Sequence, residues 1–245
     1  MPTYAIGDIH GHIDALRAAH ARIAADRARH GTDAPIVHVG DLVDRGPDCR
    51  GVIDYLIAGQ AAGKPWVVLK GNHDRLFRMF LADPDWNDPG LREDMHWFDP
   101  RLGGAATLSS YGVAARLGDD ARAVRDEALR KVPTAHLRFL DTLALTHLRE
   151  EALFVHAGIR PGVDLRDQTE DDLVWIRRGF LEDRRDHGAL VVHGHTAIAC
   201  ATHCGNRLNI DSGVAYGGPL SAVLVEGRAA WLIAAEGRVP LVAGP

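Results

Sequence analysis

The chain has 245 residues, of which 46% are hydrophobic and 25% are charged, an ordinary composition for a globular protein. A chain of this length can form one domain that needs no disulfide or structural metal merely to fold. Its net charge of −5 lacks the basic excess typical of nucleic-acid binding, so we expect no nucleic-acid partner.

The cysteine content and the hydropathy of the chain indicate in which cellular compartment the protein is expected. Three cysteines are too few for a disulfide framework, which favours a reducing environment. We see no signal-peptide pattern, and no apolar run approaches the ~20 residues of a membrane span. We therefore expect a cytoplasmic protein without a membrane partner, and the oligomeric state stays open. The tract from Cys200 to Cys204 could bind a metal, but a Gly-Asn turn at Gly205 favours an ordinary hairpin.

The first third of the chain alternates short apolar runs with helical periodicity. Such alternation predicts a parallel sheet, and ligand sites in parallel sheets lie beyond the carboxyl ends of the strands. The predicted strands are 4–6, 36–39 and 66–70, and the predicted helices are 12–29, 49–61 and 72–81.

The regular pattern breaks after residue 83, where prolines, glycines and aromatic residues mix as far as residue 118. Helical patterns return at 120–131 and 133–143. A long connection in a compact domain is typical of a lid or binding loop. We interpret 83–143 as a mainly helical lid insertion within a single domain that spans 1–245.

The last hundred residues are rich in strand patterns, which predicts a more mixed or antiparallel sheet in the second half. These strands are expected at 144–147, 152–156, 189–193, 199–203, 207–210, 221–225 and 229–234.

Metal-binding side chains follow five of the predicted strands. The candidate ligands are Asp8, His10, Asp41, Asn72, His156 and His195. Because the ends of neighbouring strands meet, we expect one site at one edge of one sheet. In chain order, the first two residues would bind one ion, Asp41 would bridge two ions, and the last three would bind the second. Carboxylate, imidazole and amide groups suit Mn²⁺, Fe²⁺ or Zn²⁺, and a pair of such ions is typical of phosphatases and nucleases.

Neighbouring residues suggest how a phosphate group would be handled. Arg45 offers a planar fork that matches phosphate oxygens. His73 can protonate a departing oxygen as general acid, with Asp44 to orient it. A local ion pair between Asp44 and Arg45 is the structural alternative. His193 lies on the same face as His195, where it could support the site or pack in the core.

The motifs GDIHGH, GDLVDRG, GNHD, VHAG and HGHT together resemble those of the phosphoprotein phosphatase family of calcineurin-like metallophosphoesterases. The resemblance runs from Gly7 to about Gly218. It is greatest to the bacterial and phage serine/threonine phosphatases, which are related to symmetrical dinucleoside tetraphosphatases. It implies an α/β (α+β) fold, an α/β/β/α sandwich of two mixed β-sheets, and the residue roles given above. It adds Arg177 as a second phosphate ligand, with Arg178 as the alternative, and Tyr216 in a loop that approaches the site.

These features together favour a dimetal-dependent phosphomonoesterase of serine/threonine protein phosphatase type, with Mn²⁺ as the expected metal and Fe or Zn as alternatives. In the family, a hydroxide that bridges the two metals attacks phosphorus directly. The substrate would be a phosphorylated protein or peptide, or a small phosphoester. The alternative is a bis(5'-nucleosyl)-tetraphosphatase that hydrolyses dinucleoside polyphosphates. His10, where typical dinucleoside tetraphosphatases carry Gln, favours the phosphatase. A non-catalytic module is disfavoured because every ligand and the acid are present.

Overall fold

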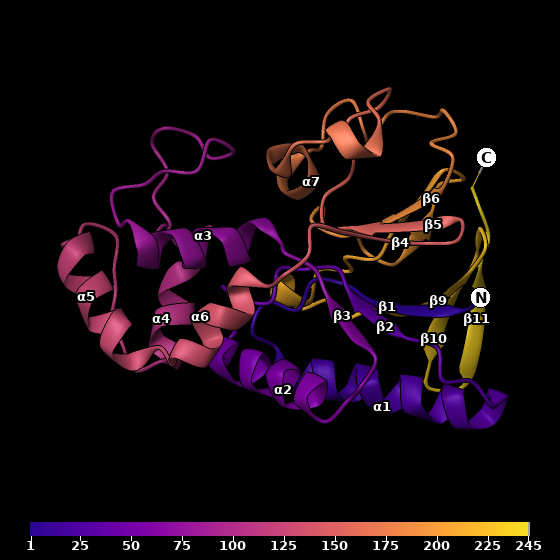
Figure 1. Ribbon diagram of the computed structural model, residues 1–245, viewed down its shortest axis with the longest axis horizontal. Helices are drawn as coiled ribbons and strands as arrows, with labels where there is room; N and C mark the ends of the chain where they lie inside the picture. The colour runs from indigo at the N-terminus through magenta and orange to yellow at the C-terminus, as the bar shows by residue number, and fades with distance from the viewer. Residues whose placement is uncertain (245) are drawn as a thin grey trace.

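The computed structural model describes residues 1–244, in which two β-sheets pack face to face between outer helices (Figure 1). In the first sheet the strands run in the order β11-β10-β9-β1-β2-β3. Its members are β1 (Thr3–Ile6), β2 (Ile36–His38), β3 (Trp66–Val68), β9 (Ala222–Glu226), β10 (Ala229–Ala234) and β11 (Gly237–Leu241). β1, β2 and β3 are parallel, whereas β9 returns antiparallel to β1 and extends the sheet through two hairpins.

The second sheet has the order β4-β5-β6-β8-β7 and mixes parallel with antiparallel pairs. Its members are β4 (Thr146–Arg149), β5 (Ala152–Val155), β6 (Leu190–His193), β7 (Thr202–His203) and β8 (Arg207–Asn209). The central strands β5 and β6 are buried along their whole length, which explains their uninterrupted apolar runs. β7 and β8 form the hairpin expected around Gly205.

Three apolar layers hold the sandwich together. Between the sheets, side chains such as Val37 and Leu69 of the first sheet pack with Phe154 and Val192 of the second. Beneath the first sheet lie α1 (Ile13–His30) and α2 (Cys49–Ala61), and above the second sheet lies α7 (Glu170–Trp175). The expected α/β/β/α sandwich is therefore confirmed.

Local signals account for the helices that carry the layers. α1 buries residues at helical spacing, among them Leu16, His20 and Ile23, and ends at Gly31 in the left-handed conformation. α2 begins at Asp48, whose carboxylate accepts a hydrogen bond from the amide of Gly51. Across residues 1–244, the helices are all too short or too polar to span a bilayer.

One expectation was wrong: the candidate ligands do not lie at one edge of one sheet. β1, β2 and β3 belong to the first sheet, whereas β5 and β6 belong to the second. The final strands of the chain, which we expected in a second sheet, complete the first because β9 pairs with β1. Apolar periodicity predicts that a strand exists but does not determine its neighbour. β11 and α7 were not predicted either.

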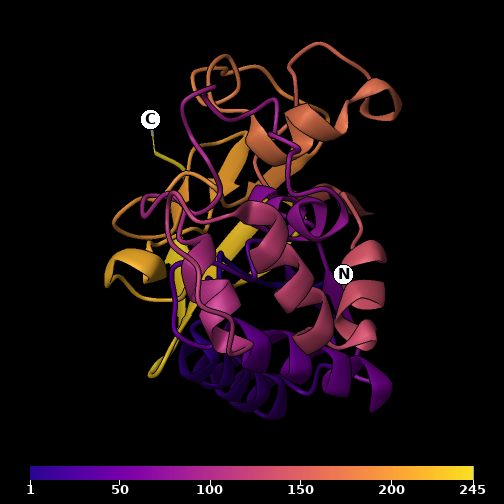
Figure 2. The same ribbon diagram turned by 90° about the vertical axis from the view of Figure 1, so that its left-hand side faces the viewer.

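The segment 83–143 forms a helical lobe beside the sandwich (Figure 1), and this lobe faces the viewer in Figure 2. It contains α4 (Gly104–Ser110), α5 (Ala121–Lys131) and α6 (Thr134–Asp141), and it packs on α3 (Asn72–Ala82). Trp97 and Phe98 are buried against Phe77 and Phe80 of α3, so part of the aromatic content extends the apolar core that lies beneath the first sheet. Whether this insertion acts as a lid stays a prediction.

Candidate active site

The loops after β1, β2, β3, β5 and β6 meet where the two sheets adjoin. The backbone carbonyl of Asp41 accepts hydrogen bonds from the amides of Ile9 and His10, at 3.0 and 2.8 Å. The Asp41 carboxylate accepts one from the amide of His73, at 3.0 Å. Across the sheets, the amide of His195 donates to Asp8 Oδ2 at 2.9 Å. These bonds bring together side chains from distant parts of the chain.

Two buried groups of ligand atoms share the carboxylate of Asp41. One group contains His10, Asp41 and His73, the other contains Asp41, His156 and His195, and the ligand atoms of each group lie within 4.8 Å of one another. His10 Nε2 is 3.4 Å from one carboxylate oxygen of Asp41, and His156 Nε2 is 3.3 Å from the other. The two oxygens thus face different imidazoles, as a bridging ligand requires.

Backbone carbonyls fix the direction of the imidazoles. His10 Nδ1 lies 2.7 Å from the carbonyl of Val43, and His156 Nδ1 lies 2.9 Å from that of Val39, so each Nδ1–H donates to backbone. Their Nε2 atoms are therefore unprotonated and can bind a metal ion, which is the usual arrangement of metal-binding histidines. Asn72 Oδ1 lies 3.0 Å from His156 Nε2 and brings an amide oxygen to the same place.

Asp8 Oδ1 and His195 Nε2 are among the buried polar atoms that lack a hydrogen-bond partner in the described part of the chain. Leaving such atoms unpaired costs free energy, which a divalent cation would offset. A side chain at Gly194 would place its Cβ 1.9 Å from Asp8 Oδ1, so glycine keeps this oxygen accessible. The donor set of carboxylate, imidazole and amide suits borderline divalent ions, and these residues therefore fit a metal centre.

Burial sets the charges of the group. It lowers the pKa of His10 and His195 well below the usual value, which keeps both imidazoles neutral and able to bind a metal. Burial, with Asp211 and Asp41 nearby, raises the pKa of Asp8 well above its usual value. Burial also opposes the charge of Asp41, but the surrounding histidines outweigh it and hold the pKa of that carboxyl below its usual value.

The groups expected to handle phosphate border this centre. His73 Nδ1 lies 2.6 Å from Asp44 Oδ2. Arg45 reaches His10 Nε2 at 2.6 Å and His73 Nε2 at 3.0 Å. Asp44 is thus paired with His73 and not with Arg45, contrary to the local ion pair considered as an alternative.

Arg177 and Tyr216 also reach the site. The Arg177 guanidinium donates to the carbonyl of His195 at 3.4 Å, and the guanidinium of Arg45 lies 5.2 Å from the centre of the Tyr216 ring. Burial lowers the pKa of Arg177. The charges of nearby site residues also act on it, namely those of Asp41, Arg45, Tyr216 and Asp8. The contact favours Arg177 over Arg178 as the second phosphate ligand, and that choice stays a prediction. His193 lies edge-on to Phe180, as a packing residue would.

Unusual backbone conformations concentrate in this site. Among residues 1–244, the non-glycine residues with positive φ are His10, Asp41, Asp44, Arg45, Glu150 and His195. All except Glu150 are candidate site residues. Such conformations cost free energy and persist where surrounding contacts enforce them, which is common at functional sites.

The structure adds residues that the sequence analysis did not select. The carboxylate of Asp74 accepts hydrogen bonds from the amides of Leu42 and Gly71, and so ties the second motif to the third. Asp211 lies beside Asp8, and burial raises its pKa. Asp74 ends the GNHD motif, and Asp211 begins the loop that carries Tyr216, so their positions in the sequence could have marked them as candidates.

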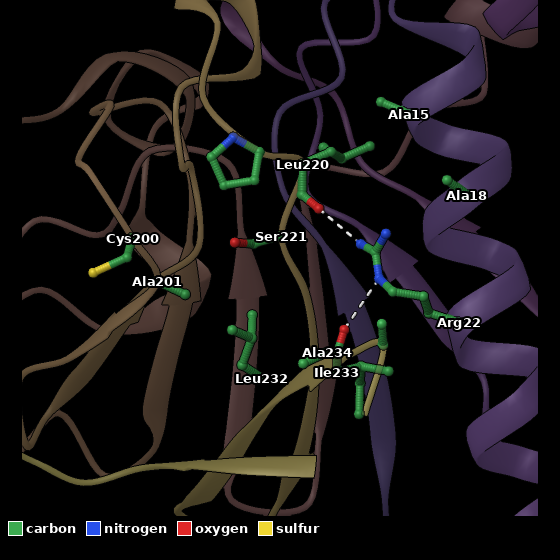
Figure 3. A pocket seen from close by; sticks show the side chains of 12 residues that line it. Ala15, Ala18, Arg22, Cys200, Ala201, Leu220, Ser221, Leu232, Ile233 and Ala234 are labelled. Carbon is green, nitrogen blue, oxygen red and sulfur yellow. Dashed lines mark hydrogen bonds between the residues drawn. The ribbon is translucent and has the colours of Figure 1, made fainter. Parts of the chain in front are cut away.

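A separate cavity of about 420 Å³ lies between α1 and β10 (Figure 3). Small and apolar side chains line it, together with Arg22. The guanidinium of Arg22 donates to the carbonyls of Ile233 and Leu220, at 3.1 and 2.9 Å, so it supports the loop before β9. The candidate metal ligands do not line this cavity, and we assign the chemistry to the sheet junction.

The sequence matches the model of a known protein family and is similar to several known proteins. The pattern of the family described as Calcineurin-like phosphoesterase matches residues 1–226. The asymmetrical bis(5'-nucleosyl)-tetraphosphatase PrpE of Anoxybacillus flavithermus is 26% identical over 241 residues, which cover 89% of this chain and 88% of that protein. The protein of the same name from Halalkalibacterium halodurans is 26% identical over 234 residues, with 89% and 87% covered.

Solved structures share the fold. A protein proposed to be a diadenosine tetraphosphatase matches with a TM-score of 0.63 and 22% identity, over 99% of this chain and 95% of its own. A cold-active protein-tyrosine phosphatase of a psychrophilic Shewanella matches with a TM-score of 0.63 and 15% identity, over 98% and 80%. At these identities the likeness concerns the fold alone.

If Asp8 binds a metal, the variant Asp8→Asn should have opposite effects on the stability of the protein without and with Mn²⁺. Because burial and neighbouring carboxyls disfavour its charge, the variant should stabilise the metal-free protein by about 0.5–2 kcal/mol at neutral pH. The same change removes a ligand, so it should reduce the stabilisation by Mn²⁺, which is about 2.7 kcal/mol for a site at 100 times its Kd. Urea unfolding with EDTA and with Mn²⁺ measures both effects.

Asp14→Asn is the matched control, because Asp14 is exposed on α1 and should change neither value. An Asp8→Asn protein that is still stabilised by Mn²⁺ as strongly as wild type would contradict the assignment of Asp8 as a ligand.

Proposed function

The chain belongs to the calcineurin-like phosphoesterase family, and from that premise we propose that it hydrolyses dinucleoside polyphosphates, with bis(5'-nucleosyl) tetraphosphates as the substrate class. The names of its relatives support this over the serine/threonine phosphatase that we favoured from sequence, for which no specific support was found. The names of these relatives outweigh the argument from His10, which favoured the phosphatase. The family resemblance itself is confirmed.

One contact carries the proposal: the Arg45 guanidinium lies 5.2 Å from the centre of the Tyr216 ring. Tyr216 is 68% exposed, which is high for a residue type that is usually at least partly buried. An exposed ring beside a phosphate-binding arginine suits a nucleobase at the end of a phosphate chain. Arg177 lies close enough to influence the same group of charges, so two cations border the path of a polyphosphate.

The residues present would hold two divalent ions, with Asp41 shared between the two groups of ligand atoms. When bound, such ions stabilise charge on phosphoryl oxygens and activate water as a nucleophile. Mn²⁺ is our proposal for their identity. The protein itself would supply cationic groups for the phosphate chain through Arg45 and Arg177.

His73 would deliver a proton to the leaving oxygen from Nε2, while its Nδ1–H is held by Asp44 at 2.6 Å. The tight pairing fixes the plane of the ring and the direction in which Nε2 points. Arg45, which contacts His73 Nε2 at 3.0 Å, would hold the transferred phosphate beside that proton. Leaving-group protonation and phosphate binding thus use adjacent groups.

A substrate panel tests the proposal. With Mn²⁺ present, kcat/KM for diadenosine tetraphosphate should exceed that for phosphoserine and phosphothreonine peptides by about tenfold or more, because each stacked base contributes roughly 1–3 kcal/mol. If cleavage is asymmetrical, as in the names of the relatives, chromatography will show a nucleoside monophosphate and a triphosphate in equal amounts. A clear preference for phosphopeptides would contradict the proposal and favour the protein phosphatase.

Tyr216→Ala should raise the KM for diadenosine tetraphosphate by about 5- to 100-fold, because it removes the ring on which a base would stack. Steady-state kinetics on this substrate and on phenyl phosphate, which carries no nucleobase, measure the effect. Tyr216→Phe keeps the ring and is the matched control. An equal loss on both substrates would show that Tyr216 does not recognise a base.

A further inference from the structure

The carboxylate of Asp44, the partner of His73, is completely buried and receives hydrogen bonds from three side chains. Oδ2 accepts from His73 Nδ1 at 2.6 Å and from the indole Nε1 of Trp97 at 2.8 Å. Oδ1 accepts from the hydroxyl of Thr107 at 2.6 Å. Of these donors, only His73 belongs to the motifs that the sequence analysis selected.

Trp97 and Thr107 both come from the insertion, 53 and 63 residues further along the chain than Asp44. Thr107 is bonded to Asp44 twice, because its hydroxyl also accepts from the backbone amide of Asp44 at 2.8 Å. Near the same place, the amide of Arg45 donates to the carbonyl of Gly103 at 3.2 Å. The insertion therefore holds both the side chain and the backbone of the turn that carries Asp44 and Arg45.

These donors are themselves fixed by packing. Trp97 is 4% exposed and stacks on Phe77 with ring centres 5.6 Å apart, while Thr107 is fully buried in α4. The turn they hold is unfavourable on its own, since Asp44 and Arg45 have φ of 71° and 68°. Without the contacts from the insertion, the turn would relax toward commoner backbone conformations.

We propose that Trp97 and Thr107 are positioning residues for proton transfer, which hold Asp44 so that His73 aims its Nε2 at the leaving oxygen. This inference rests on the proposed acid role of His73. The insertion then does more than cover the site, because it completes the hydrogen bonds of the acid pair. A displacement of the insertion would remove both donors at once and leave a buried carboxylate with a single partner.

Dependence on the leaving group separates a positioning role from a general structural one. A general acid matters most when the leaving oxygen is basic, and matters little for an activated ester such as 2,4-dinitrophenyl phosphate. We would measure kcat for that ester, 4-nitrophenyl phosphate and phenyl phosphate, with saturating Mn²⁺. His73→Asn removes the acid itself and so gives the largest effect to be expected, a fall in kcat of about 10²- to 10⁴-fold on phenyl phosphate.

Trp97→Phe keeps the ring in its stack and removes only the indole N–H, and Thr107→Val keeps the shape and removes the hydroxyl. Each should lower kcat for phenyl phosphate about tenfold, the effect of losing one hydrogen bond to a charged group, with little change for the dinitrophenyl ester. Thr107→Ser restores the hydroxyl and should restore kcat. Trp86→Phe, in the same insertion, is the matched control.

The outcomes separate the two levels of inference. If His73→Asn makes kcat depend more steeply on the leaving group but Trp97→Phe and Thr107→Val do not, the positioning role is wrong while the acid role stands. If His73→Asn leaves the dependence unchanged, the acid role fails and this proposal fails with it. Should Trp97→Phe not fold, the comparison of Thr107→Val with Thr107→Ser still decides the question.

Discussion

Asp41 is the residue around which the molecule is organised. Its backbone carbonyl binds the amides that follow β1, its carboxylate binds the amide of His73, and its two oxygens face His10 and His156. A buried carboxylate is costly unless it is surrounded by donors and cations, so the loops of both sheets must close around it. The same closure brings the candidate metal ligands together and fixes how the two sheets meet.

Glycines make that close approach possible. A Cβ at Gly7 would lie 2.2 Å from the carbonyl of Ile210, which follows β8 of the other sheet, and a Cβ at Gly71 would lie 2.1 Å from the carboxylate of Asp41. The glycines of the Gly-Asp and Gly-Asn motifs therefore have a packing role as well as a turn role. Strained residues such as Asp41 and Asp44 are the cost of this geometry, and the surrounding hydrogen bonds hold them in place.

Local patterns were sufficient to predict much of the fold. α2 and β10 have the predicted bounds at both ends, because helical periodicity and a β-rich run stand between clear turn signals. Sheet membership was not predictable from these patterns, and β11 was missed because Arg238 and Pro240 interrupt any apolar run. For the site, residues at strand ends could be selected, since each lies within a few residues of the end of an apolar run. Trp97 and Thr107 could not, because their contact with Asp44 depends on how a distant insertion folds back.

The central claim is that one junction of two sheets holds a pair of divalent ions that share Asp41. Crystals grown with Mn²⁺ and measured at the manganese absorption edge test it directly. We expect two anomalous peaks on either side of the Asp41 carboxylate, one beside Asp8 and His10 and the other beside Asn72, His156 and His195. A single peak, or peaks away from Asp41, would contradict the account.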